Sequence, residues 1–247
     1  MQPDTKIFII VPCYNEEKRL QTDFFINFLK DNKNYAFLFV NDGSIDNTLT
    51  LLQTNAKEND RFCVLNLEKN EGKAEAVRRG MLYVFENYDC DFIGFWDADL
   101  ATPLFEIHNF VHIIQKYDCD MVTGLRLMRL GAKVKRKSSR HYLGRIFATV
   151  ASKTLKLPVY DTQCGAKLYK KQIVKPLFTN KFISKWLFDV EILARYINFF
   201  GHQNAIEKIY ESPLFQWEDM SGSQLKVKDF VKAPIELWKI RKQYLSK

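Results

Sequence analysis

The sequence predicts an α/β fold in which a mixed, mainly parallel central sheet is flanked by helices. Three observations predict it. Short apolar runs rich in β-branched and aromatic residues alternate with segments whose apolar residues recur at helical spacing. Strands that alternate with helices need crossover connections, and such connections produce parallel strands. The chain of 247 residues is long enough to bury a substantial core, and we expect a single domain over 1–247.

The expected strands follow one another along the first half of the chain, at 7–11, 35–40, 62–65, 92–96 and 119–123. Helical patterns separate them, and the clearest of these places Ala74, Val77 and Met81 on one face. After the fourth strand come Thr102 and Pro103. A capping residue followed by proline predicts that a helix begins there.

Composition narrows the class of protein. The chain is 47% hydrophobic and 27% charged, which is ordinary for a soluble globular protein. Its five cysteines are scattered without a C-x-x-C pair, so we expect reduced thiols and a cytoplasmic location. No apolar run approaches the length of a membrane helix, and a strand starts close to the N-terminus, so we expect neither a membrane span nor a signal peptide. The net charge of +8 favours an anionic partner.

The segment 91–100 carries the clearest chemical signal. A buried strand ends there in two carboxylates one residue apart, Asp97 and Asp99. Open α/β sheets place their ligands at the carboxyl ends of strands. A hard divalent cation, Mg²⁺ or Mn²⁺, needs few protein carboxylates when a substrate diphosphate completes its coordination. The alternative is a pair of solvated turn acids, because short motifs recur by chance.

Three other strands end in comparable polar loops, which contain Asn15-Glu16, Asp42-Gly43-Ser44 and Gly72-Lys73. The carboxyl ends of parallel strands lie at one edge of a sheet, so we expect these groups to converge on one crevice. Four loops that converge favour a ligand site over surface decoration.

Positive charge dominates the stretch from 121 to 160, which has ten Lys or Arg and no Asp or Glu. It predicts a solvated basic face, a loop that holds a second anion, or a contact with anionic lipid. A helix is expected in this stretch. One of its sides is formed by Tyr142, Ile146, Thr149 and Val150, and Arg145 lies on the outside. The segment 231–245 suits either an amphipathic helix at a membrane interface or a helix packed on the core.

Taken in order, the motifs at 12–17, 41–44, 70–73 and 97–99 resemble family 2 glycosyltransferases with the GT-A fold. In the second half, the segments similar to dolichyl-phosphate β-glucosyltransferases are 161–165, 186–191, 217–218 and 222–223. Mannosyl-transferring relatives are the next most similar. The resemblance spans nearly the whole chain. It implies that 1–125 bind the nucleotide sugar, and that 126–247, with the basic loop and the C-terminal amphipathic helix, bind the acceptor.

The resemblance also implies roles for individual residues. It assigns nucleotide-sugar binding, with Asp42 on the base, to Pro12, Tyr14, Glu16, Asp42, Lys73, Asp97, Ala98 and Asp99. Asp97 and Asp99 would in addition hold Mg²⁺ or Mn²⁺. The acceptor phosphate would be bound by Arg126, Arg140 and Gln163. Ala101 and Ala166 depart from the pattern, since some mannosyl relatives have a metal ligand at the first position and the glucosyl enzymes have an aromatic residue at the second.

The expected reaction is an inverting, metal-assisted transfer of a hexose, namely glucose from UDP-glucose, to a polyprenyl or dolichyl phosphate. A UDP-sugar is preferred over a GDP-sugar on the resemblance alone. A phosphate acceptor is already anionic, whereas the alternative acceptor, a sugar hydroxyl in polysaccharide or glycolipid assembly, needs a base. The catalytic set is then Asp97, Asp99 and Asp189, with Asp189 as the base and Asp161 behind it. A structural role is the alternative for both of these last two.

A non-enzymatic polyanion-binding protein is a more remote alternative. It would leave the paired carboxylates at 97 and 99 without a purpose. We therefore expect no nucleic-acid partner. The expected location is cytoplasmic, with a peripheral contact to the cytoplasmic face of a membrane.

Overall fold

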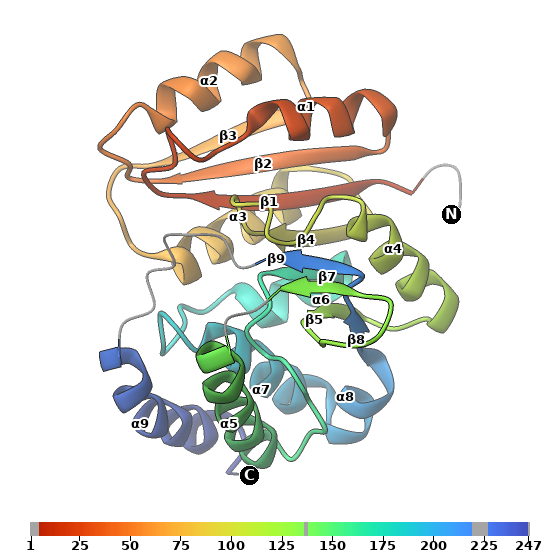
Figure 1. The fold of residues 1–247 in the computed structure, drawn as a ribbon, viewed down its shortest axis with the longest axis vertical. Coiled ribbons are helices and arrows are strands. Elements are labelled where there is room, and N and C mark those ends of the chain that lie inside the picture. The colour runs from red at the N-terminus through yellow and green to blue at the C-terminus, as the bar shows by residue number, and fades with distance from the viewer. Residues whose placement is uncertain (1–4, 136–137, 219–226, 247) are drawn as a thin grey trace. The chain divides into compact units, whose positions relative to one another are not determined.

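The computed structural model describes residues 5–135, 138–218 and 227–246. The chain forms two compact units, each built from two stretches of sequence (Figure 1). Unit 1 comprises Met1–Leu100 and Ala166–Lys181, and unit 2 comprises Ala101–Gly165 and Phe182–Lys247. The sequence-based boundary at 125 does not coincide with the boundary between these units. The assignment of a nucleotide-sugar half and an acceptor half stays a prediction.

Unit 1 is organised around a sheet in the order β3-β2-β1-β4-β7. Its strands are β1 (Ile7–Cys13), β2 (Tyr35–Asp42), β3 (Phe62–Leu67), β4 (Phe92–Trp96) and β7 (Ala166–Lys170). The first four are mutually parallel where they pair, and β7 runs antiparallel to β4. The mixed, mainly parallel sheet is therefore confirmed, whereas β7 was not predicted. At Gly94 a Cβ would lie 2.4 Å from the Lys167 carbonyl oxygen, so only glycine permits this close approach of β4 and β7.

The helices of unit 1 are α1 (Thr22–Asp31), α2 (Thr48–Glu58), α3 (Lys73–Asn87) and α6 (Lys171–Phe178). Alternate residues of β2 show that α1 and α3 cover opposite faces. Phe37 and Phe39 meet Phe25 of α1 at ring-centroid distances of 5.1 and 5.0 Å. Val40, on the other face of the strand, lies against Gly80 of α3. The sheet is thus flanked by helices on both sides, as predicted.

Unit 2 contains two short pairs of parallel strands, β5 with β8 and β6 with β9. Its elements are α4 (Glu106–Tyr117), β5 (Met121–Leu125), β6 (Lys133–Lys135), α5 (Ser138–Leu155), α7 (Phe188–Phe200), α8 (His202–Lys208), β8 (Ile209–Pro213), β9 (Gln216–Glu218) and α9 (Val227–Tyr244). The helix expected to begin at Pro103 begins at Glu106. The residues before it form turns whose hydrogen bonds span three residues, such as the one from the Glu106 amide to the Pro103 carbonyl.

The face of α5 was predicted wrongly. Its buried residues in the described part of the helix are Phe147, Ala148, Ala151 and Leu155. Ile146 and Val150, which the sequence pattern placed toward the core, are exposed. Small alanines can occupy a tight packing face as well as larger residues can, and a pattern based on bulky side chains overlooks them. The helix α9 also divides into two faces, with Ala233, Leu237 and Ile240 buried and Ile235 and Trp238 exposed. Within the described residues, no helix is long and apolar enough to cross a membrane.

Candidate active site

Unit 1 brings together the loops that follow its parallel strands. The loop after β1 is tied to the loop after β2 by backbone and side-chain hydrogen bonds. The Asn15 amide donates to Ser44 Oγ at 3.0 Å, and the Ile45 amide donates back to Asn15 Oδ1 at 3.0 Å. The Glu16 amide donates to Thr48 Oγ1 at 2.8 Å. These bonds hold the first two polar loops against each other.

Asp42 joins the loop after β2 to the loop that begins α3. Its two carboxylate oxygens accept the backbone N–H groups of Glu71 and Gly72 at 2.9 and 2.8 Å. Gly43 beside it has a φ of +63°, and a Cβ there would lie 2.4 Å from the Asn70 amide nitrogen. Asp42 is 2% exposed, so the structure gives it a definite role in shaping the loop. The expected contact of Asp42 with a nucleotide base stays a prediction.

Lys73 connects the start of α3 to the paired carboxylates. Its Nζ forms an ion pair with Asp97 Oδ1. Asp97 and Asp99 directly follow β4 and are partly exposed, whereas Ala98 between them is buried. The main chain then turns sharply, because Leu100 adopts a left-handed φ of 54°. The paired acids therefore lie at the end of a strand, as the sequence predicted, and the structure adds the ion pair of Asp97 with Lys73.

The charges of these loops act on one another. Burial raises the pKa of Glu16, the adjacent Arg19 opposes this rise, and the charges of Asp99 and Asp46 add to it. The charge of Asp99 also contributes to the raised pKa of Arg19. Pro12, near the end of β1, and Tyr14, in the same loop as Glu16, are half-buried. The loops after β1, β2, β3 and β4 thus form one polar cluster in unit 1.

The donor set at this cluster fits a hard cation that is mainly coordinated by a substrate. In the part of the chain that the structure describes, no group of three or more His, Cys, Asp or Glu side chains could hold a metal ion. Two carboxylates can supply only part of a coordination shell. Mg²⁺ and Mn²⁺ commonly bind in this way, with phosphate oxygens and water completing the shell. Asp97 and Asp99 would be the protein ligands.

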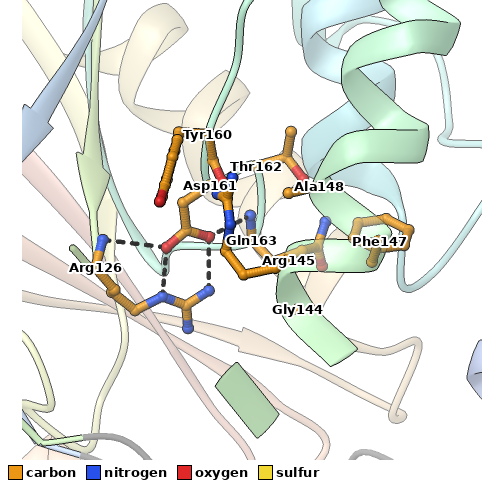
Figure 2. Close-up of a pocket in the computed structure, with 9 residues that line it drawn as sticks. All are labelled: Arg126, Gly144, Arg145, Phe147, Ala148, Tyr160, Asp161, Thr162 and Gln163. Atoms are coloured by element: carbon orange, nitrogen blue, oxygen red, sulfur yellow. Dashed lines mark hydrogen bonds and ion pairs between the residues drawn. The ribbon is translucent and has the colours of Figure 1, made fainter. Parts of the chain in front are cut away.

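Unit 2 contains a pocket between residues 144–148 of α5 and the loop 160–163 (Figure 2). It is lined by Arg126, Gly144, Arg145, Phe147, Ala148, Tyr160, Asp161, Thr162 and Gln163. Arg126 follows β5, and its guanidinium forms a two-pronged ion pair with Asp161, in which Nε and Nη2 each lie 2.7 Å from a carboxylate oxygen. Both side chains are largely buried, at 13% and 10% exposure. Arg126 therefore has a fixed orientation at the edge of this pocket.

Arg145 is a pocket residue that the sequence did not reveal. Its guanidinium carbon lies 3.3 Å from the centroid of the Tyr160 ring, and Nη1 donates to the Tyr160 carbonyl at 3.0 Å. The sequence pattern had assigned Arg145 to the outside of the helix. Tyr160, fifteen positions later in the chain, holds the Arg145 side chain. The spacing of residues along a helix cannot predict a contact with a residue outside that helix.

The other predicted acceptor residues have different outcomes. Gln163 lines the pocket, and among the described residues its buried Nε2 has no hydrogen-bond partner. Such a donor is costly to bury unless a ligand meets it. The side chain of Arg140 lies outside the described residues, as do Gly222 and Ser223. Asp189 is 5% exposed in the first turn of α7, where the helix dipole favours a carboxylate.

The comparisons with known proteins agree with this arrangement. The model of glycosyl transferase family 2 matches residues 8–178. Dolichyl-phosphate beta-glucosyltransferase ALG5A of Trichomonas vaginalis is 31% identical to this chain, over 94% of the chain and 72% of that protein. The dolichyl-phosphate beta-glucosyltransferase of Saccharomyces cerevisiae is 30% identical, over 99% of the chain and 77% of that protein. That of Dictyostelium discoideum is 32% identical, over 88% of the chain and 68% of that protein.

Solved structures give the fold. Glucosyl-3-phosphoglycerate synthase from Mycobacterium tuberculosis, in complex with Mn²⁺, UDP and phosphoglyceric acid, matches with a TM-score of 0.69 at 15% identity, over 98% of this chain and 79% of that chain. Its complex with Mn²⁺ and UDP-glucose matches with a TM-score of 0.66 at 15% identity, over 97% and 79% of the two chains. These likenesses show the GT-A fold that the sequence predicted. Sequence motifs, sheet topology and family model together establish that this chain belongs to glycosyl transferase family 2 and is a glycosyltransferase.

Proposed function

We propose that this chain catalyses the inverting, metal-assisted transfer of a hexose, glucose from UDP-glucose, to a polyprenyl phosphate. The observation that carries the proposal is the pocket of unit 2, where Arg126, Arg145 and the buried Gln163 amide gather around one small space. Guanidinium groups and amide donors suit phosphate oxygens. The names of the similar dolichyl-phosphate beta-glucosyltransferases support a prenyl-phosphate acceptor.

The loop cluster of unit 1 would bind the nucleotide sugar. We assign the pyrimidine nucleotide to the ends of β1 and β2 and the loop after β1, with Pro12, Tyr14, Glu16 and Asp42, and the diphosphate to Lys73, Asp97 and Asp99. A divalent cation bound by the two aspartates would supply positive charge opposite the negative charge that develops on the departing diphosphate. Lys73 adds positive charge at the same place, since it is already paired with Asp97. UDP is favoured because the solved structures with this fold contain UDP and UDP-glucose.

The phosphate acceptor would attack the anomeric carbon with an oxygen that is already an anion. The reaction then needs positioning of that oxygen more than it needs a base. The pocket residues would hold the phosphate against repulsion from the donor diphosphate. A sugar hydroxyl acceptor would instead need a base, and the buried Asp189 is the residue we assign to that alternative.

The direct test is transfer of label from UDP-glucose to a polyprenyl phosphate, measured in the organic phase with Mn²⁺ or Mg²⁺ present. Label should enter the organic phase, and the transfer should stop with a chelator or with Asp99→Asn. UDP-mannose and GDP-mannose in parallel reactions identify the donor. Asp189→Asn separates the two acceptor classes, because a hydroxyl acceptor would lose turnover whereas a phosphate acceptor would show a modest effect. Absence of lipid-linked label with every donor would refute the proposal.

We further propose a peripheral contact with the cytoplasmic face of a membrane through α9. Ile235 and Trp238 are 59% and 60% exposed on this helix, and Lys242 lies over the Trp238 ring at 5.3 Å. Exposed apolar side chains among basic ones suit an interface with anionic lipid. Trp238→Asp should reduce flotation with vesicles that contain phosphatidylserine. Phe199→Asp, at a 54% exposed position of α7, is the matched control and should float like the wild type. Equal flotation of both variants would contradict this contact.

A further inference from the structure

Asp161 makes an unusual number of hydrogen bonds for a side chain beside a proposed substrate. Oδ2 accepts the backbone N–H of Arg126 at 3.2 Å and its Nε at 2.7 Å. Oδ1 accepts Nη2 of Arg126 at 2.7 Å and the backbone N–H of Gln163 at 3.2 Å. We infer that Asp161 is a positioning residue that holds two phosphate-binding groups, Arg126 and Gln163, in register for the acceptor. The inference rests on the proposed function and deepens it.

The hydrogen bonds of Asp161 argue against the other role considered for it. A carboxylate offers about four lone-pair positions, two on each oxygen. Four donors already occupy the carboxylate of Asp161. To accept a proton from a sugar hydroxyl, it would have to release Arg126 or the loop at Gln163. We therefore infer that Asp161 does not serve as the reserve base, because its lone pairs are committed to other groups.

Asp161 is itself held in place from β8. The two carboxylate oxygens of Glu211 accept the backbone N–H groups of Tyr160 and Asp161, each at 2.7 Å. These bonds fix the main chain of the loop from which the Asp161 side chain projects. The same loop continues to Gln163, so the two hydrogen bonds of Glu211 also fix the main chain that carries the Gln163 side-chain amide. Glu211 thus acts on the pocket through Asp161.

Arg126 is confined on its other side by an aromatic ring. The centroid of the Trp217 ring lies 5.3 Å from the guanidinium carbon, within the range of a cation–π contact. The turn before Trp217 is held by Glu106, which is 1% exposed and accepts the Phe215 amide at 2.7 Å. Asp161 and Trp217 therefore restrict both the edge and the face of the Arg126 guanidinium.

A long side chain with fixed orientation binds an anion without first losing its rotational freedom. Misplacement of a binding group by about 1 Å can reduce a rate roughly 100-fold. We therefore expect Asp161→Asn to raise the KM for polyprenyl phosphate by about 10- to 100-fold. The KM for UDP-glucose should stay within about twofold of the wild type, because a positioning residue of the acceptor site has no part in donor binding.

The test is a double-mutant cycle of Asp161→Asn with Arg126→Lys, read as KM for each substrate and as the pH profile of kcat. If Asp161 acts in part through Arg126, Asp161→Asn should weaken acceptor binding less in the Arg126→Lys background than in the wild type, and the effect that remains is the one exerted through Gln163. Glu211→Gln, which keeps the ion pair and loosens the loop, should raise the acceptor KM in the same direction. Glu207→Gln is the matched control, because Glu207 is exposed on α8, where its carboxylate accepts the side-chain amide of Gln203. Effects of Asp161→Asn and Arg126→Lys that multiply, or a lost acidic limb in the pH profile of Asp161→Asn, would overturn the inference.

Binding of farnesyl phosphate, measured by calorimetry without turnover, separates this inference from the proposed function. Farnesyl phosphate that binds the wild type and binds Asp161→Asn at least tenfold more weakly supports the inference, even if no glucose is transferred. In that case the proposed reaction is wrong and the anion site is right. No binding of farnesyl phosphate to the wild type, or equal binding to both proteins, would overturn the inference. Far-UV circular dichroism of each variant checks that the fold is intact.

Discussion

The strongest prediction for stability concerns a buried ion pair in unit 2. Glu191, on α7, is fully buried, and its Oε1 accepts Arg195 Nη2 at 2.8 Å and the Tyr244 hydroxyl at 3.0 Å. Its Oε2 accepts the backbone amides of Ile183 and Ser184 at 2.8 and 3.4 Å. One carboxylate therefore joins α7, α9 and the loop that leads to Trp186. The perturbation we choose is Glu191→Gln, which keeps the shape and removes the charge.

The expected loss follows from burial. The Arg195 side chain is only 2% exposed, so without Glu191 its charge has little access to water. Breaking a buried ion pair by removing one partner typically costs about 3–5 kcal/mol. For a protein of this size, each kcal/mol shifts Tm by roughly 2–4 °C. We therefore expect the Tm of Glu191→Gln to fall by about 6–20 °C.

The assay is thermal unfolding followed by circular dichroism, with Glu218→Gln as the control. The Glu218 pair with Lys135 is exposed, and such pairs contribute about 0–1 kcal/mol. Glu191→Gln combined with Arg195→Met should recover part of the loss, because no charge is then left buried and the Gln side chain still offers an acceptor to the Ile183 and Ser184 amides. A Tm of Glu191→Gln within 2 °C of that of Glu218→Gln would refute the reasoning.

Three further predictions concern single positions. Gly43→Ala should destabilise the protein by about 1–3 kcal/mol, because its Cβ would overlap the Asn70 amide. Gly201 also has a positive φ but no close neighbour, so Gly201→Ala should destabilise the protein less. Equal losses in Tm would contradict this prediction. Lys73→Met should raise the KM for the nucleotide sugar about tenfold and leave the acceptor KM unchanged, because a charge-assisted contact with the diphosphate is lost; an unchanged donor KM would contradict it. Burial raises the pKa of the Cys90 thiol to about 11. At a pH between about 9 and 11 the thiol therefore keeps its proton in the folded chain and has lost it in the unfolded chain, so the free energy of unfolding should fall as the pH rises through this range. Cys90→Ala should show a shallower fall of Tm over that range, and identical slopes would contradict the assignment.

Local patterns in the sequence were sufficient to predict much of unit 1. The strand 92–96 was predicted with the bounds that the structure gives it, and the loops after the parallel strands lie together as expected. Both results depend on features within a few residues of one another: apolar runs, turn residues and the direction of parallel strands. Asp42 shows where this reasoning stops. Its position was predicted, whereas its bonds to Glu71 and Gly72 were not.

Unit 2 was less predictable because its contacts join distant parts of the chain. Arg126 pairs with Asp161 across 35 positions, and Arg145 meets Tyr160 across 15. The helical pattern placed Arg145 on the outside, because the pattern considers only which positions of the helix hold bulky apolar residues. It does not include the segments that pack against the helix. The same limit explains why the antiparallel β7 was missed.

The sequence by itself determined the α/β class, the polar loops at the strand ends and the family resemblance, because residue order encodes periodicity and motif spacing directly. Only the tertiary structure decided that Asp161 is occupied as a partner of Arg126 and that Arg145 lines the pocket. Whether a carboxylate is a base or a positioning group depends on which donors reach its lone pairs. Those donors are brought to Asp161 by the fold, from β5 and from its own loop, and no local pattern specifies that meeting.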